Sequence, residues 1–214
     1  MSSIVKKYDR AIYLFNRDLR RHDNELLRRA ADESKYVLAI FIFTRVQTSS
    51  RNQYLNVRSI QFMAESLAEL AKSININFYY GDTSTIMRRL IDDFRPAAIY
   101  NNLDVSPFAI ARSADLAAIC KPLDIHFIQG RDIFFGRHSI PDLFKVDGSA
   151  YLKFTPFYNN AIAHVTKEKP AAATSGHNFI KLRDEHTILG QNRMRELMRI
   201  NTVDGVSQTV FTPG

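Results

Sequence analysis

The sequence predicts an α/β fold: a doubly wound, Rossmann-like sheet of five parallel strands with helices on both faces, followed by an irregular C-terminal extension. Two observations support this. Five short apolar runs alternate with four helical segments through the first 128 residues, and the joints between them are short. The second run, residues 36–43, is continuously apolar, which is typical of a strand covered on both faces. Alternating strands and helices imply right-handed crossovers, and therefore a parallel sheet.

A strand is expected wherever a short apolar run is followed by a turn residue or a helix-cap residue. They cover residues 11–15, 36–43, 75–80, 97–100 and 125–128. Gly81 ends the third of these strands, and Pro96 separates the preceding helix from the fourth.

The helices between the strands are expected over residues 23–34, 52–73, 82–94 and 106–121. The second is the longest, and its apolar residues recur at helical spacing: Ile60, Met63, Leu67, Leu70 and Ile74. Asp82 is a cap for the third helix. Ser106 followed by Pro107 is a typical start for the fourth, because proline is favoured at the first helical position.

The chain divides into three parts. Residues 1–130 form the α/β domain, and residues 131–165, rich in aromatic residues, are expected to be a packed extension of it. Residues 166–214 are expected to be an interdomain linker and the truncated start of a further domain. Within this last part, we expect residues 179–214 to be loose, helical in patches, or involved in self-association.

The composition is that of a globular protein, with 45% hydrophobic and 24% charged residues among 214. A net charge of +7 favours polyanionic partners, but no basic arm or stripe stands out, so a merely basic soluble protein fits equally well. The single cysteine, Cys120, excludes an intramolecular disulfide and a cysteine-rich metal site. No signal peptide or membrane-length apolar run is visible, so we expect an intracellular, soluble protein of undetermined compartment.

A candidate site lies where the strand order of such a sheet reverses. Ligands of open α/β sheets bind there, at the carboxyl ends of the strands. With the order 3-2-1-4-5, this switch point lies between the first and fourth strands. Arg17 follows the first strand and Asp104 follows the fourth, so the two residues would face a ligand or each other. Both readings remain open from the sequence.

The sequence lacks the motifs of other common phosphate-binding, hydrolase and metal sites. No G-x-G-x-x-G follows the first strand, and neither G-x-x-x-x-G-K-[ST] nor G-x-S-x-G occurs anywhere. The six histidines show no metal-ligand spacing. The sequence therefore offers no catalytic residue and no metal ligand.

Four segments resemble the DNA photolyase/cryptochrome family, in the family's order and at sensible spacing. They are "NRDLRRHDNELL" (16–27), "RSIQFMAESLAEL" (58–70), "NNLDVSPFAIARSADL" (101–116) and "KVDGSAYLKFTPFYNNAI" (145–162). One departure is Ser113, which stands where the family usually has an aspartate directly after the arginine, here Arg112.

The resemblance covers the family's N-terminal α/β domain, which holds a light-harvesting antenna chromophore. It implies that the family's helical domain, with FAD, the electron-transfer tryptophans and the DNA-lesion pocket, is missing from this chain, which contains no tryptophan. A deazaflavin or FMN is favoured over a folate, because folate-type members use an asparagine–glutamate pair on the fourth helix and none is found. The chromophore-binding residues implied by the resemblance are Arg17, Phe41, Phe43, Arg45 and Asp104. Asp18, Arg20, Asp23 and Asn24 are read as structural residues.

The resemblance implies a deoxyribodipyrimidine photolyase-like protein, involved in light-dependent DNA repair of pyrimidine dimers and inactive alone. It would act with a separate helical FAD-binding chain and contact DNA only through that partner. No membrane is expected among its partners. One alternative is a cryptochrome-like light-signalling or interaction module. Another is a nucleotide-binding α/β protein of universal-stress type, although Gly130, Gly136 and Gly148 are too dispersed for its phosphate loop. Whether the chain is an enzyme stays open.

Overall fold

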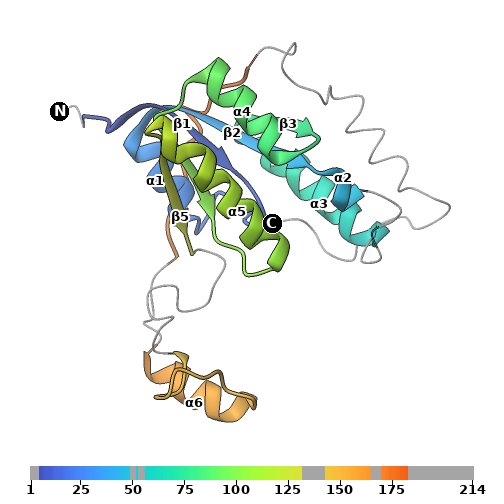
Figure 1. Cartoon of the computed structure of the whole chain (residues 1–214), viewed down its shortest axis with the longest axis vertical. Coiled ribbons are helices and arrows are strands. Elements are labelled where there is room, and N and C mark those ends of the chain that lie inside the picture. The colour runs from blue at the N-terminus through green and yellow to red at the C-terminus, as the bar shows by residue number, and fades with distance from the viewer. Residues whose placement is uncertain (1–4, 49–51, 53–55, 132–142, 165–169, 183–214) are drawn as a thin grey trace.

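The sheet has the strand order that the sequence predicts. The computed structural model describes residues 5–48, 52, 56–131, 143–164 and 170–182 (Figure 1). Within them, five strands form one parallel sheet in the order β3-β2-β1-β4-β5. The strands are β1 (Tyr8–Leu14), β2 (Ser34–Phe43), β3 (Ile76–Tyr80), β4 (Ala98–Asn102) and β5 (His126–Gly130). The predicted fold class is confirmed, and the order reverses between β1 and β4.

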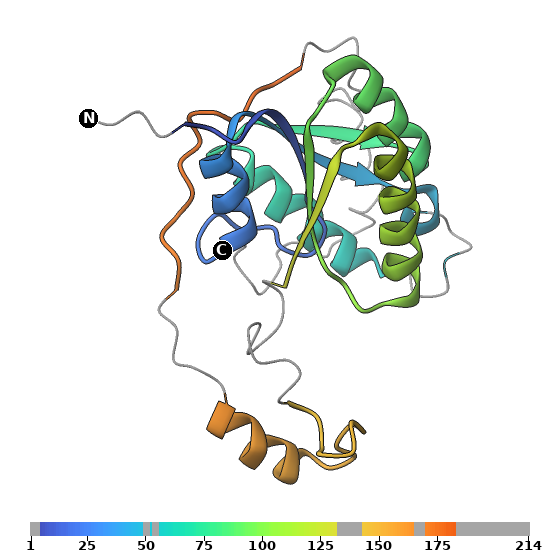
Figure 2. The same cartoon turned by 60° about the vertical axis from the view of Figure 1, so that its left-hand side comes forward.

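Helices cover both faces of the sheet (Figures 1 and 2). On one face lie α1 (Glu25–Glu33) and α3 (Val57–Leu70), and on the other lie α4 (Thr83–Phe94) and α5 (Pro107–Cys120). Short helical turns, α2 (Arg45–Thr48) and η1 (Lys121–Leu123), follow β2 and α5.

The second predicted helix, residues 52–73, begins later and ends earlier than expected. The side chain of Asn56 accepts hydrogen bonds from the backbone N–H groups of Arg58 and Ser59, which fixes the start of α3. At the other end, Lys72 and Ser73 bond to carbonyls three residues back, so the chain leaves the α-helix after Leu70.

Alternation along the strands divides the core between the two faces of the sheet. Ala11, Tyr13 and Phe15 contribute to the cluster under α1 and α3, whereas Ile12 and Leu14 contribute to the cluster under α4 and α5. Strand β2 alternates in the same way and is buried at every position from residue 37 to residue 43. The continuous apolar run was therefore a correct sign of a strand covered on both faces.

Residues 170–182 correct one expectation, because they are held firmly although their composition is that of a linker. We name them the strap. Its Asn178 and Ile180 form backbone hydrogen bonds with Val37 of β2, at 3.0 Å each, and Phe179 is buried in the core. The expectation of a loose chain after residue 179 is wrong for residues 179–182; residues 183–214 lie outside the described residues.

The part of the expected packed extension that the structure describes, residues 143–164, does not pack on the sheet. It contains α6 (Phe154–His164), which stands apart from the α/β domain in both views (Figures 1 and 2). The side chains of Leu152 and Phe154 are 94% and 73% exposed. In the part of the chain that the structure describes, no helix is long and apolar enough to cross a membrane.

Candidate functional site

A buried carboxylate organises the loop at the switch point. Asp18 is fully buried, and it accepts hydrogen bonds from the Tyr13 hydroxyl at 2.5 Å and from the Asn102 amide at 2.8 Å. The backbone N–H of Asn16 donates to the same carboxylate at 3.0 Å. These donors come from both sides of the switch point, so Asp18 joins the end of β1 to the end of β4. A buried charge is tolerated where several donors satisfy it.

The chain then turns directly into α1. Asn24 is the N-cap, and its side-chain oxygen accepts from the N–H of Leu27 at 3.0 Å. Before it, Asp23 has a left-handed backbone conformation, and its carbonyl oxygen accepts from the Arg20 guanidinium at 2.7 Å. These contacts agree with the structural reading of Asp18 and Asn24, whereas Arg20 and Asp23 also line the cavity described below.

Arg17 and Asp104 meet across the switch point. The Arg17 Nε lies 3.0 Å from the Asp104 Oδ2, and the two side chains are 69% and 9% exposed. The other carboxylate oxygen of Asp104 accepts from the N–H of Ser106 at 2.9 Å, at the start of α5. Asp104 is therefore fixed, whereas most of the Arg17 side chain remains open to solvent.

A cavity of about 920 Å³ opens at this position. Its size lies in the range of about 300–1,000 Å³ that is usual for small-molecule sites. Arg17 and Asp104 line it, together with side chains from the end of β2, from α3 and from α5.

Aromatic side chains from the sheet and from two helices line the cavity. Phe62 of α3 and Phe108 of α5 line it and are 41% and 45% exposed, so both rings are within reach of a ligand. Phe41 of β2 lies deeper and is nearly buried. Apolar rings around a few polar groups suit a planar ligand with a polar edge.

Arg112 of α5 is a lining residue whose charge has no described partner. Its Nε and Nη2 are shielded from solvent and have no hydrogen-bond partner among the described residues. Burial lowers the pKa of the Arg112 guanidinium, while the nearby Asp104 carboxylate acts in the opposite direction. Its guanidinium also lies over the Phe108 ring, 5.9 Å from the centroid.

The structure brings together three of the five expected site residues. Arg17, Phe41 and Asp104 line the cavity. Phe43 is not among the lining residues, because its ring is buried against Phe41 at 4.8 Å and Phe78 at 6.3 Å; a ligand contact at Phe43 stays a prediction. Arg45 begins α2, and its side chain lies outside what the structure describes; its role stays a prediction.

Sequence reasoning missed the wall residues of α3 and α5. Phe62 and Arg112 fall within two of the segments that carry the family resemblance. That position was the only feature of the sequence that could have pointed to them as site residues. Their helices could be predicted, but the side of each helix that faces the switch point depends on tertiary packing. Across the residues described, no group of three or more histidine, cysteine or acidic side chains could hold a metal ion.

Comparisons with known proteins agree on one family. The family model of DNA photolyase matches residues 11–174. Among curated proteins, cryptochrome-1 of Anopheles gambiae is 25% identical over 131 residues, which covers 55% of this chain and 24% of the relative.

Solved structures share the fold of this chain. A photolyase of Sulfolobus tokodaii, described with two FAD molecules and a novel light-harvesting cofactor, aligns with a TM-score of 0.77 and 25% identity over 96% of this chain. A Synechocystis cryptochrome aligns with a TM-score of 0.70 and 17% identity over 86%. A class III photolyase of Agrobacterium tumefaciens aligns with a TM-score of 0.65 and 19% identity over 85%. The chain spans less than half the length of each, namely 44%, 42% and 37%.

Proposed function

The chain belongs to the DNA photolyase family, and on that premise we propose that its α/β domain binds a flavin-type antenna chromophore in the cavity at the switch point. The observation that carries the proposal is the cavity itself. Aromatic side chains from two helices form its walls, and the fixed Arg17–Asp104 pair lies at one edge. When bound, such a chromophore absorbs light and passes the excitation to a second flavin.

The residues present fit a flavin or deazaflavin ring. Phe62 and Phe108 supply partly exposed rings for stacking, and the Asp104 carboxylate is an acceptor for a ring N–H. Most of the Arg17 side chain is open to solvent, so its guanidinium has donors for a ring carbonyl. The preference for FMN or deazaflavin over folate rests on the family resemblance of the sequence; the Sulfolobus tokodaii photolyase is described with two FAD molecules and a novel light-harvesting cofactor.

The wider activity we propose is light-dependent repair of pyrimidine dimers in DNA. FAD and DNA would be bound by a helical domain in a separate chain, and this domain would supply the excitation energy. A cryptochrome-type signalling role is the second candidate, since one similar curated protein is a cryptochrome and another cryptochrome is among the similar structures. Repair of dimer-containing DNA by the chain together with its helical partner would support the first candidate. If that complex absorbs light but repairs no DNA, the second candidate is supported.

Replacing Arg17 by glutamine is expected to weaken FMN binding about tenfold, because a charge-assisted hydrogen bond to the ring is lost. The free energy of unfolding should change by less than about 1 kcal/mol, since the Arg17 side chain is 69% exposed and Asp104 keeps its hydrogen bond from the N–H of Ser106. Titration of FMN followed by fluorescence anisotropy measures the affinity, and urea unfolding measures the stability.

The matched control is Arg88→Gln, which removes the same charge from an exposed position on α4 outside the cavity. Deazaflavin should bind as FMN does, and a reduced folate should not. If neither FMN nor deazaflavin binds the unchanged chain in a saturable manner, the proposed function is wrong. If both bind and Arg17→Gln binds equally well, only the role of Arg17 is wrong.

A further inference from the structure

The strap is held to the α/β domain at two places. It runs beside α1, from the loop before this helix to the strand after it (Figure 2). At the far end, which we name the distal anchor, residues 178–180 bond to β2 and Phe179 is buried in the core. At the near end, which we name the proximal anchor, Ala171 and Thr174 bond to the loop between β1 and α1.

The proximal anchor consists of hydrogen bonds between two backbone segments. The N–H of Asp23 donates to the carbonyl oxygen of Ala171 at 2.9 Å, and the N–H of Ala171 donates to the Asp23 carboxylate at 3.2 Å. The N–H of Thr174 donates to the carbonyl oxygen of Arg21 at 3.1 Å. Residues 172 and 173, which lie between these contacts, are exposed. The proximal anchor lacks a buried ring such as that of the distal anchor, and contacts of this kind open at a lower free-energy cost than a core does.

The loop that carries the proximal anchor is also part of the cavity wall. Arg20, His22 and Asp23 line the cavity. Pro170, the first residue of the strap, lines it as well. Asp23 has a left-handed backbone conformation, with φ at 51°, which is unfavourable for a residue other than glycine unless its neighbours hold it. A ligand in the cavity would therefore contact the residues that hold the strap.

We propose that the strap responds to the ligand: filling the cavity keeps the proximal anchor closed, and opening of that anchor weakens ligand binding. The inference rests on the proposed function, because the ligand is the flavin proposed for this cavity, and it adds a means of regulating that site. When the anchor opens, Pro170 leaves the cavity wall and Asp23 loses contacts that fix its backbone, so the open form offers the ligand fewer contacts. A ligand that binds the closed form more tightly shifts the chain toward that form.

Amide hydrogen exchange followed by NMR tests the effect of the ligand on the strap. With saturating FMN, the N–H groups of Ala171 and Thr174 should exchange about three to ten times more slowly than in the free chain, as expected when contacts worth about one hydrogen bond depend on the closed anchor. The N–H of Gly148, which bonds to the carbonyl of Lys145 outside the α/β domain, is the internal control and should keep its rate.

Ala171→Pro tests the reverse direction. Proline has no N–H, so the variant loses the hydrogen bond to the Asp23 carboxylate, and Ala171 is not among the residues that line the cavity. The affinity for FMN should fall about three- to tenfold, the range expected for the exchange rates, because the coupling is reciprocal. The matched control is Ala173→Pro, at an exposed strap position whose N–H bonds to no described residue. It should bind FMN as the unchanged chain does.

The outcomes separate the inference from the proposed function. If FMN binds but exchange at Ala171 and Thr174 is unchanged, the inference is wrong and the proposed function stands. The same conclusion follows if Ala171→Pro and Ala173→Pro bind FMN equally well. If FMN does not bind the unchanged chain, the proposed function is wrong and the inference with it. Should Ala171→Pro fail to fold, the exchange rates of the unchanged chain decide alone.

Discussion

Replacing Asp18 by alanine is expected to lower the free energy of unfolding by about 3 to 5 kcal/mol, the range for loss of a buried, hydrogen-bonded charge. The carboxylate is fully buried and serves donors from four other residues: Tyr13, Asn102, Asn24 and Asn16. Without it, these donors lose their acceptor in the interior, at about 1 to 3 kcal/mol for each group left unsatisfied. Urea denaturation followed by circular dichroism measures the effect.

The matched control is Asp92→Ala, which removes an exposed carboxylate from α4 and should change stability by less than about 0.5 kcal/mol. Asp18 also fixes the loop that carries Arg17 into the cavity, so any folded Asp18 variant should bind flavin poorly. A loss below about 1 kcal/mol would mean that water or a rearranged loop replaces the carboxylate.

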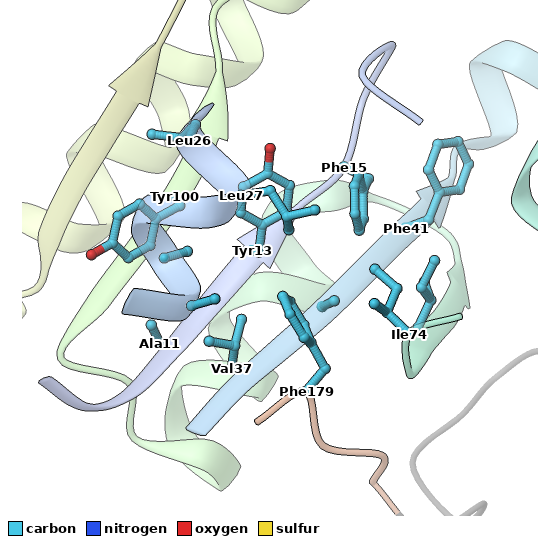
Figure 3. Close-up of a cluster of buried hydrophobic side chains, with 14 of the residues drawn as sticks. Ala11, Tyr13, Phe15, Leu26, Leu27, Val37, Phe41, Ile74, Tyr100 and Phe179 are labelled. Atoms are coloured by element: carbon cyan, nitrogen blue, oxygen red, sulfur yellow. The ribbon is translucent and has the colours of Figure 1, made fainter. Parts of the chain in front are cut away.

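Replacing Phe179 by alanine is expected to cost about 3 to 5 kcal/mol, the usual range for a phenylalanine removed from a core. The ring is 3% exposed and points into the cluster formed by β1, β2 and α3, beside Val37 and Ile74 (Figure 3). The variant should also make the strap accessible to protease.

Phe154→Ala is the matched control, because that ring on α6 is 73% exposed. It should change stability by less than about 0.5 kcal/mol. If Phe179→Ala is no more destabilising than Phe154→Ala, the strap does not contribute to the core, and the linker interpretation of residues 179–182 would be restored.

The strap could not have been recognised from its sequence, because the information that positions it lies elsewhere in the chain. The side chain of Asn178 donates to the carbonyls of Ala31 and Ser34, at 2.9 Å each, and Asn75 donates to the carbonyl of Phe179 at 2.8 Å. These contacts join residues more than 100 positions apart. Small residues and prolines without periodicity suggest a linker, and composition alone does not distinguish a loose linker from one that is held.

The sheet was predictable because each strand carries its own signal. Continuous apolar runs, cap residues and proline or glycine stops fixed the number of strands, and the crossover rule with short joints made a parallel sheet the natural solution. The switch point followed from the order of the strands, and with it the meeting of Arg17 and Asp104. Both open readings of that pair are compatible with the structure, since the two residues bond to each other and line the cavity.

The walls of the cavity were not predictable in the same way. Phe41 and Phe43 lie on the same side of β2, yet only Phe41 lines the cavity, because Phe43 packs toward Phe78 of the neighbouring strand. Alternation in a strand assigns a side chain to a face of the sheet, but not to a position relative to a cavity on that face. The contributions of α3 and α5 depend equally on how these helices lie across the sheet.

The central claim, that the cavity at the switch point binds a flavin, is tested most directly with a single tryptophan. The chain has none, so Phe62→Trp places one fluorophore in the cavity wall, and Phe154→Trp places one on exposed α6 as the control. We expect FMN to quench Phe62→Trp strongly and saturably, with a much smaller effect on Phe154→Trp under the same conditions. Equal, non-saturating quenching of both variants would contradict the account.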